Sequence, residues 1–409
     1  MVVSADAYLA GPENGWPALA WEERDWVSAL PAGMGSRTLR RRHAGPYQAA
    51  VPPRIAKLDV LLPTAAIAAA DEASTEIARF DGEMGSEIAP FAAILLRSES
   101  ASSSKIENLT SGAKAIALAE LGSDDRQNAS EIVANVHAMQ AAIDLADRLD
   151  EAAVLAMHAA LMQRNHPDEA GRWRSEQVWI GGGDFGPHGA AFVPPHNERV
   201  PEAMTDLMSF VRRDDLPVLA HAALAHAQFE TIHPFADGNG RTGRALVHSM
   251  LRARGLTRNV TVPVSAGVLT DTDAYFAALM AYRQGDATRI VRLIAEASFT
   301  AIANGRQLVA DLRRVRQRWN DVIKSRQDAS AWALADLLLR QPVIDADVVQ
   351  RVLGVTSANA HRAIRQLAEA GVTSEFSGRR RDRMWQAREV LVALDEFAAR
   401  AGRRRRASR

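Results

Sequence analysis

Hydrophobic residues recur every three or four positions along most of the chain, which is the period of an amphipathic α-helix. The pattern begins near residue 58, runs to about residue 163, and returns between residues 201 and 319. Residues 1–57 lack this period and are rich in Gly, Pro and Trp, so we expect an irregular N-terminal arm there. The pattern therefore predicts a mainly α protein.

One stretch departs from the helical period. Residues 172–196 read RWRSEQVWIGGGDFGPHGAAFVPPH, with β-favouring side chains on both sides of a Gly- and Pro-rich turn. Val178, Trp179 and Ile180 precede the turn, and Phe192 and Val193 follow it. This arrangement predicts a β-hairpin within the helical protein.

Composition limits the chemistry further. The 409 residues carry 49 basic and 49 acidic side chains, so no net charge attracts nucleic acid or a membrane. Cysteine is absent, which excludes thiol catalysis and cysteine zinc sites and fits a reducing cytosol. We find no basic leader with an apolar core and no apolar run of about 18 residues. We therefore expect a cytoplasmic protein without a signal peptide and without a membrane partner.

Residues 233–244 read HPFADGNGRTGR and contain the letters G-x-G-x-x-G of a dinucleotide-binding turn. Such a turn follows a β-strand, and an acidic residue for the ribose lies about 20 positions later. Here residues 219–232 are Ala-rich and helical, and no Asp or Glu lies between Arg244 and Asp271. A P-loop is excluded because no Lys-Ser/Thr pair follows the glycines. The stretch therefore needs another interpretation.

The same stretch offers an anion site. Pro234 ends the preceding helix, and Gly238 and Gly240 allow main-chain N–H groups to converge on an anion. The next helix, expected to start at residue 241, points its positive end at the same place. Arg241 and Arg244 share a helix face, so both guanidinium groups can bind phosphate.

A base and a metal ligand flank this anion site. His233 can accept a proton from an attacking hydroxyl near neutral pH, and Asp237 suits a Mg²⁺ ion that already coordinates phosphates. Phe235 is the apolar anchor of the loop. A zinc site at His226, Glu230 and His233 is not expected, because the pattern H-E-x-x-H is absent. The combination indicates phosphoryl or nucleotidyl transfer.

The stretch resembles the signature of the Fic family, H-P-F-x-[DE]-G-N-G-R-x-x-R, at every defined position, and the similarity extends over roughly residues 40–300. The resemblance implies a Fic fold and transfer of AMP from ATP and Mg²⁺ to a Ser, Thr or Tyr hydroxyl of a target protein, releasing pyrophosphate. It makes His233 the general base and Asp237 the Mg²⁺ ligand. It places the ATP phosphates at Gly238, Asn239, Gly240, Arg241 and Arg244.

The resemblance adds two elements outside the motif. The predicted hairpin corresponds to the family's flap, in which Val178, Trp179 and Ile180 would align the acceptor segment by strand addition. Ser103 and Glu107 lie in a sequence similar to the inhibitory motif [ST]-x-x-x-E-[GN]. Glu107 would then pair with Arg244 and block productive ATP binding. In some relatives the same glutamate supports AMP removal, so a reversible enzyme is a further option.

Residues 328–397 resemble a winged helix-turn-helix. Asn359, Arg362 and Arg365 would lie on the recognition helix, and Arg379, Arg380 and Arg381 in the wing, so DNA is a candidate partner. The alternative is a module that binds only proteins, as many winged helices do.

The expected segments, in order, are an irregular arm (1–57), N-terminal helices (58–127) with the inhibitory helix at about 98–110, the Fic core (128–300), a connector helix (301–327), the winged helix (328–397) and a basic tail (398–409). Two alternatives to an adenylyltransferase remain: a phosphotransferase like the Doc toxins, and a DNA-binding regulator with a secondary Fic activity. A homodimer is also possible, and the sequence identifies neither the target protein nor its acceptor residue.

Overall fold

The computed structural model describes residues 16–26, 43–85, 90–123, 125–183, 185–324, 330–378 and 382–403. It is mainly helical, as the sequence predicted. Two compact units divide the chain. The first contains residues 1–74, 141–254 and 273–295, and the second contains residues 75–140, 255–272 and 296–409.

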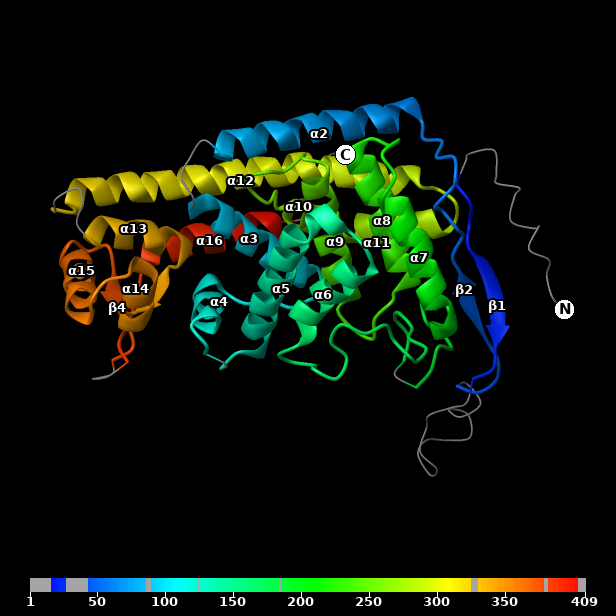
Figure 1. Cartoon of the computed structure of the whole chain (residues 1–409), viewed down its shortest axis with the longest axis horizontal. Helices are drawn as coiled ribbons and strands as arrows, with labels where there is room; N and C mark the ends of the chain where they lie inside the picture. The colour runs from blue at the N-terminus through cyan, green and yellow to red at the C-terminus, as the bar shows by residue number, and fades with distance from the viewer. Residues whose placement is uncertain are drawn as a thin grey trace, which may run out of the picture. The chain divides into compact units, whose positions relative to one another are not determined.

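A two-stranded antiparallel sheet begins the described part of the first unit (Figure 1). It pairs β1 (Ala20–Arg24) with β2 (Tyr47–Val51). The expectation of an irregular arm missed both strands, and the sequences AWEER and YQAAV explain why. Ala, Glu and Gln are poor strand formers, so these strands depend on packing rather than on intrinsic preference. Tyr47 and Val51 supply that packing, since both side chains are buried.

The helices of the first unit surround α8 (Val218–Ile232), whose residues from Leu219 onward are all buried. A helix that is apolar on every side is a core helix. The other helices are α6 (Glu151–Met162), α7 (Val200–Val211), α9 (Asn239–Ala253) and α11 (Thr272–Arg283), with 3₁₀ turns at Ala146–Arg148 and Asn197–Arg199. Gly243 lets α9 approach α8 closely, because a Cβ there would lie 2.9 Å from the Phe229 ring.

The predicted hairpin at residues 172–196 has less regular structure than expected. An isolated antiparallel bridge joins Ile180 to Phe192. The Ile180 N–H donates to the Phe192 oxygen at 2.8 Å, and the Ile180 oxygen accepts the Ala191 N–H at 2.9 Å. Gly181 and Gly182 adopt positive φ values just after the bridge, which bends the chain away from extended geometry. The described residues of this segment therefore form a bridged loop and not a pair of strands, and we call residues 175–196 the flap.

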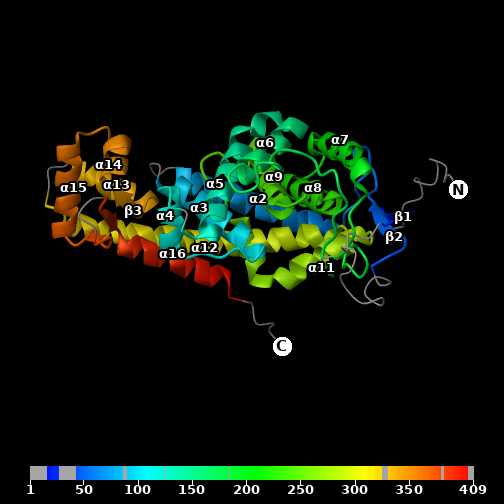
Figure 2. The same ribbon diagram turned by 90° about the horizontal axis from the view of Figure 1, so that it is seen from below.

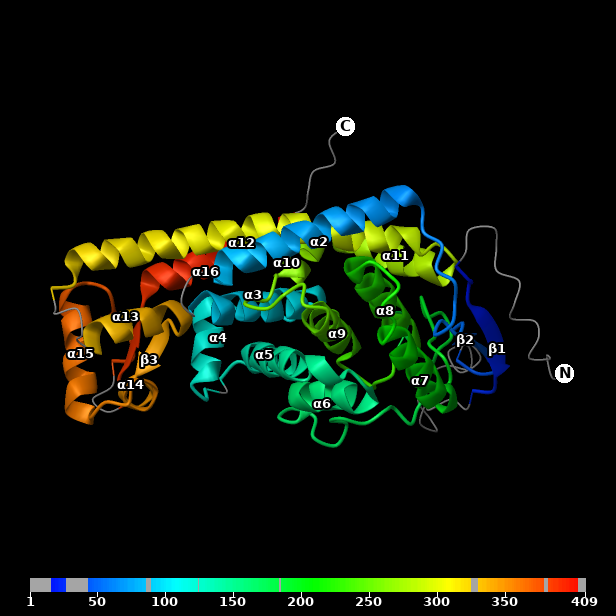
Figure 3. The ribbon, with the colours of Figure 1, turned by 45° about the horizontal axis from the view of Figure 1, so that its top comes forward.

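The second unit is built on α3 (Pro90–Ile106). It also contains α4 (Ala113–Glu120), α10 (Val264–Val268), a 3₁₀ turn at Leu269–Asp271 and α16 (Arg388–Ala401). Figure 3 shows α3 and α16 close together in this unit. The buried carboxylate of Glu99 on α3 accepts hydrogen bonds from the Ser265 N–H at 2.9 Å and the Ser265 hydroxyl at 2.5 Å. Three long helices contain the sequence positions where the units divide: α2 (Thr64–Gly85), α5 (Gln127–Asp144) and α12 (Thr288–Val322).

The last part of the second unit is a small α/β assembly (Figure 2). Its elements are α13 (Ser330–Arg340), β3 (Val343–Asp345), α14 (Ala346–Leu353), α15 (Ser357–Glu369), β4 (Ser374–Glu375) and β5 (Met384–Gln386), with sheet order β3-β5-β4. Thr356 caps α15 by accepting the Asn359 N–H. Arg379, Arg380 and Arg381 lie outside the described residues, as does the end of the basic tail from residue 404.

Among the described residues, no helix combines the length and the apolar character that crossing a bilayer requires.

Candidate functional site

The loop between α8 and α9 carries the predicted base. His233 directly follows α8 and adopts a left-handed conformation, with φ 50° and ψ 62°. Its N–H still bonds to the Phe229 oxygen at 2.8 Å, so the helix ends there. Positive φ is uncommon outside glycine, and such strained residues gather at functional sites. The backbone at His233 is thus held in a conformation that the surrounding structure must enforce.

Asn239 closes this loop. Its Oδ1 accepts the Phe235 N–H at 2.8 Å, and its Nδ2 donates to the Phe235 oxygen at 2.9 Å. The sequence assigned Asn239 to ATP phosphates, and that role stays a prediction. The structure gives its side chain an additional loop-closing contact, which fixes the path of the chain over residues 235–239.

Gly238 and Gly240 differ, although the sequence treated them alike. Gly238 has φ 75°, and a Cβ there would lie 2.9 Å from the Leu161 Cδ2 atom. Gly240 belongs to the first turn of α9, which begins at Asn239 and not at residue 241 as expected. The expectation of an unusual backbone at Gly240 was therefore wrong, and its first-turn N–H group belongs to the helix N-terminus instead.

An aromatic stack supports the loop from the side of α6. Phe235 is buried, and its ring lies 3.6 Å from the parallel ring of His158 and 5.0 Å from that of Trp173. The Gly171 N–H donates to His158 Nδ1 at 3.0 Å, so the ring proton is on Nε2, which donates to the Asp237 oxygen at 3.1 Å. Burial lowers the pKa of His158 to about 4, which keeps this support neutral.

Two buried arginines lie in the first turns of α9. Arg241 and Arg244 are both about 95% buried, which excludes a solvated helix face for either. Asp237, in contrast, has a side chain that is 60% exposed, and its carboxylate lies 3.4 Å from Arg241. No group of three or more potential metal ligands exists among the described side chains. A single exposed carboxylate fits Mg²⁺ that arrives with phosphates, since such ions keep one or two protein ligands.

The electrostatics of His233 favour the neutral imidazole. Its side chain is 19% exposed, and burial lowers its pKa to about 3, with further lowering from the charges of Arg283 and Arg174. A hydrogen bond to the main chain of Glu230 acts in the opposite direction and raises the pKa of His233. A neutral ring can accept a proton, and bound phosphates would offset the arginines and strengthen the base.

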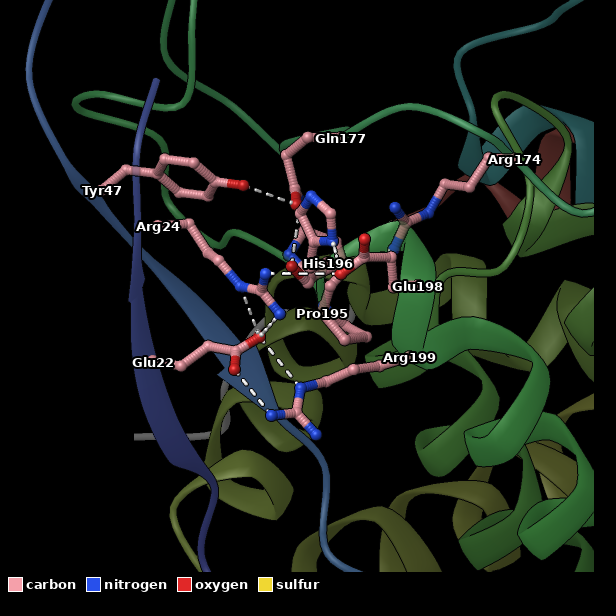
Figure 4. A network of polar contacts seen from close by, with 10 residues as sticks. Glu22, Arg24, Tyr47, Arg174, Gln177, Pro195, His196, Glu198 and Arg199 are labelled. Atoms are coloured by element: carbon pink, nitrogen blue, oxygen red, sulfur yellow. Dashed lines mark hydrogen bonds and ion pairs between the residues drawn. The ribbon is translucent and has the colours of Figure 1, made fainter. Parts of the chain in front are cut away.

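The flap is anchored to the N-terminal sheet. The Tyr47 hydroxyl donates to Gln177 Oε1 at 3.0 Å, and Gln177 Nε2 donates to the Pro194 oxygen at 3.0 Å (Figure 4). The main chain of Ala50 also donates to the Val193 oxygen at 3.1 Å. The flap therefore rests on β2 along its returning arm.

The three predicted docking residues lie on the other arm and are partly buried. Trp179 packs edge-on against Trp26, with ring centroids 5.5 Å apart, and its Nε1 donates to the Gly183 oxygen at 2.9 Å. Ile180 forms the bridge described above, and Val178 precedes Trp179. Docking by Val178, Trp179 and Ile180 stays a prediction.

An ion network joins β1 to the 3₁₀ turn that follows the flap. Glu22 on β1 accepts from Arg199 at 2.9 and 2.6 Å, and Arg24 lies 3.4 Å from Glu198. Figure 4 shows these side chains converging between the strand and the 3₁₀ turn. The pKa of Glu22 is lowered, chiefly by its hydrogen bonds to Arg199. The N-terminal strands thus contact the flap and the turn that follows it, which sequence patterns did not reveal.

The remaining candidate residues lie in the second unit. Ser103 is buried within α3, and Glu107 is exposed one residue beyond the end of that helix. Arg244 belongs to the first unit, and its pairing with Glu107 stays a prediction. Asn359, Arg362 and Arg365 are exposed on α15, opposite its buried residues.

Sequence reasoning missed His158 and Arg174, which both hydrogen-bond to the main chain of the loop. Each bonds to main-chain atoms of the motif loop from a distant part of the chain. Such contacts have no sequence period, because they depend on how separate segments pack. The motif itself gave no signal for either.

Solved structures with a similar chain path include a Fic family protein from Desulfovibrio desulfuricans, at 23% identity and a TM-score of 0.49, covering 78% of this chain and 95% of that one. Another is Fic-1 from Caenorhabditis elegans, at 21% identity and a TM-score of 0.44, covering 60% of this chain and 75% of that one.

Among curated proteins, the chain is 32% identical to protein adenylyltransferase fic-1 of Caenorhabditis elegans over 152 residues, which is 36% of this chain and 27% of that protein. It is 31% identical to protein adenylyltransferase Fic of Nematostella vectensis over 146 residues, or 35% of this chain and 30% of that protein. The chain thus spans less than a third of these relatives.

Two family models match the chain in succession. The Fic/DOC family N-terminal model covers residues 67–144, and the Fic/DOC family model covers residues 148–251, including the entire motif loop. Both models match in succession and the motif is complete, so residues 148–251 are identified as a Fic/DOC domain, with the family's N-terminal region at residues 67–144.

Proposed function

We propose that this protein is an adenylyltransferase that moves AMP from MgATP to a hydroxyl group of a target protein. The observation that carries the proposal is the loop at residues 233–239, which holds His233 and the N-terminus of α9 at its two ends. Buried arginines beside a helix N-terminus suit a polyphosphate, and the neutral ring suits a proton acceptor.

In the proposed reaction the acceptor oxygen attacks the α-phosphorus of ATP. The new O–P bond forms while the bond from the α-phosphorus to the bridging oxygen breaks, and that oxygen leaves with the electron pair as part of pyrophosphate. His233 takes the hydroxyl proton. Arg241 and Arg244 hold the β- and γ-phosphates, and the first-turn N–H groups of α9 hold the α- and β-phosphates. Mg²⁺, held by Asp237 and the phosphates, would neutralise charge on the leaving group.

We also propose that Glu107 inhibits the enzyme by competing with the γ-phosphate for Arg244. The support is chemical: Glu107 lies at the exposed end of α3, and a carboxylate is the natural partner of a guanidinium group. The same residue could direct a water for removal of AMP, so a reversible enzyme is part of this proposal. Whether the enzyme acts as a dimer is a separate question that the same preparations can answer by light scattering.

The test compares Glu107→Gly with the unchanged protein, using ATP labelled at the α- or the γ-phosphate. We expect α-label on protein, more of it in Glu107→Gly, and none when His233→Ala is added. Transfer of γ-label instead would indicate a Doc-like phosphotransferase. Equal α-labelling with and without Glu107 would reject inhibition while leaving the transfer activity intact. Glu131→Gly, also on the second unit, is the control for loss of an acidic side chain.

For the C-terminal elements from α13 to α16 we propose a winged helix that binds DNA. The order helix, strand, helix, helix, strand, strand supports this, as do the exposed Asn359, Arg362 and Arg365 on α15. A regulator of this kind would act beside nucleic acid in the cytoplasm, a location that a cysteine-free chain suits.

A further inference from the structure

Arg174 ties the loop of the base to both arms of the flap. Its Nε donates to the His233 oxygen at 2.8 Å, and its own N–H donates to the Pro234 oxygen at 2.9 Å. Its Nη1 donates to the Glu176 oxygen at 2.9 Å, and its Nη2 donates to the Pro195 oxygen at 2.5 Å. One buried side chain thus contacts three separate segments of main chain, and Figure 4 shows Arg174 together with one of its partners, Pro195.

We propose that Arg174 is a positioning residue for the transfer reaction. It holds the main chain of His233 at a fixed position relative to the flap, which would present the acceptor hydroxyl. This inference rests on the proposed function, because it concerns the geometry between base and acceptor. Arg174 does not touch the reacting atoms in this account. It acts through the carbonyl group of His233.

The conformation of His233 shows why such a residue is needed. With φ 50° and ψ 62°, the residue lies in a region that costs a non-glycine residue energy. The direction of its carbonyl group follows ψ, so a hydrogen bond to that oxygen selects one ψ value and with it the direction of the imidazole. A displacement of the base by about 1 Å can reduce a rate by about 100-fold.

The flap side of the contact is equally fixed. Pro195 and Glu176 lie on opposite arms of the flap, and Arg174 bonds to a carbonyl group on each. The neighbouring Pro194 oxygen is held by Gln177, which in turn accepts the Tyr47 hydroxyl. A target segment that pairs with the flap therefore meets a platform whose distance to His233 is set by one guanidinium group.

A purely structural role is the competing explanation. Placing an arginine in a buried site costs desolvation, which lowers the pKa of Arg174 to about 10. An apolar side chain would fill the same space without this cost. The planar fork of the guanidinium group, however, donates in three directions at once, which neither an apolar side chain nor lysine can do.

Arg174 also affects the charge of the base. The groups that influence His233 are Arg283 from α11, Glu230 from α8 and Arg174 itself. Both arginines lower the pKa of His233, so replacing Arg174 by a neutral residue raises that pKa. Lysine at this position would keep the charge and lose the fork, which separates the electrostatic effect from the geometric one.

The experiment uses the full-length protein with Glu107→Gly and compares Arg174→Gln, Arg174→Lys and Arg213→Gln. Arg213 is the matched control, since it also donates to main-chain oxygens, of Leu58 at 2.7 Å and Ile55 at 3.4 Å, away from the motif loop. We expect both Arg174 variants to lower kcat by about 100-fold while the Kd for ATP changes less than about twofold. The acid limb of the pH–rate profile should move to higher pH in Arg174→Gln only.

Hydrogen–deuterium exchange provides a readout that does not need activity. Arg174→Gln should speed exchange in residues 175–196 and 235–238 together, whereas Arg213→Gln should speed it near residues 55–58. Equal kcat losses in Arg213→Gln, or unchanged exchange at both segments in Arg174→Gln, would overturn the proposal. If the Glu107→Gly protein with Arg174 intact transfers no AMP, the proposed function fails. The exchange pattern alone then decides whether Arg174 connects the motif loop to the flap.

Discussion

The imidazole ring of His158 lies flat on the phenyl ring of Phe235, with centroids 3.6 Å apart and planes inclined by 4°. The same imidazole bonds to the main chain of Gly171 and of Asp237 through its two nitrogens. A side chain on α6 therefore supports the motif loop by stacking on Phe235 and by donating to the carbonyl group of Asp237, the predicted metal ligand. Loss of this ring should affect both stability and the path of the loop.

We expect His158→Ala to lower the free energy of unfolding by about 2 to 4 kcal/mol, because it leaves a cavity and breaks an aromatic contact. It should also reduce AMP transfer, since residue 237 loses its main-chain support. Urea unfolding followed by circular dichroism measures the first effect. His166→Ala, at an exposed position shortly after α6, should change stability by less than about 0.5 kcal/mol. Equal losses in both variants would contradict this role of His158.

Gly238 is predicted to tolerate no side chain. Its φ of 75° disfavours other residues, and the added Cβ of Gly238→Ala would lie 2.9 Å from Leu161. Gly354 has a similar φ of 64° with no atom within 4 Å of an added Cβ, so Gly354→Ala measures the backbone strain alone. We expect about 1 kcal/mol for Gly354→Ala and at least about 1 kcal/mol more for Gly238→Ala. Thermal unfolding of the two variants tests this difference, which would vanish if Leu161 simply moved away.

The position of the motif loop was predictable from sequence because its residues are local. The predicted base, metal ligand, glycines and arginines all lie within residues 233–244, and the helix before them was visible from its period. Their chemical roles stay predictions. The error at Gly240 has a local cause too. Sequence alone does not show whether a helix starts before or after a glycine, since Gly is common at helix ends and tolerated in first turns.

The parts that were missed depend on long-range contacts. β1 and β2 are made of residues with weak strand preference, and they form because they pack against the flap and against each other. The flap looked like a hairpin from its Val, Trp and Ile residues, yet the glycines after Ile180 leave it a single bridge. The sequence does not distinguish Arg174 from its many other charged residues, because its contact with His233 exists only in the folded chain.

We expect Asp237 to contribute to Mg²⁺ binding and not to the free energy of unfolding. Its side chain is mostly exposed, and its ion pair with Arg241 is long, so Asp237→Ala should change stability by less than about 0.5 kcal/mol. The Mg²⁺ concentration that gives half-maximal AMP transfer should rise about tenfold or more, which a Mg²⁺ titration in the Glu107→Gly background measures. Removal of Mg²⁺ with EDTA should stop transfer by both proteins. An unchanged Mg²⁺ requirement in Asp237→Ala would assign the metal to other groups.

For the C-terminal elements, the double variant Arg362→Ala/Arg365→Ala tests DNA binding. Each arginine that contacts a phosphate contributes about 0.9 to the slope of log K against log salt concentration. If both residues contact phosphates, the slope should fall by about 1.8 while the protein remains folded, because both side chains are exposed. Fluorescence anisotropy with duplex DNA at several salt concentrations gives the slope. An absence of salt-dependent binding by the unchanged protein would instead favour a protein-binding role for this region.

The buried histidines should make the protein sensitive to acid. Burial lowers the pKa of His221 from 6.5 to about 4, and its Nε2 lies 2.9 Å from the Phe210 oxygen. Between these two pH values the unfolded chain binds a proton that the folded protein does not. The stability that His221 supports is therefore present above pH 6.5 and is lost as the pH falls toward 4.

Replacing His221 by a group that does not titrate should remove part of this loss. His221→Gln retains an N–H donor for the Phe210 oxygen and binds no proton. Since one proton changes the unfolding free energy by about 1.4 kcal/mol per pH unit, the stability lost between about pH 6.5 and about pH 5 should shrink by about 2 kcal/mol in this variant. Urea titrations at the two pH values give the four free energies required. Equal losses in the two proteins would show that His221 is already protonated in the folded state or stays neutral in both.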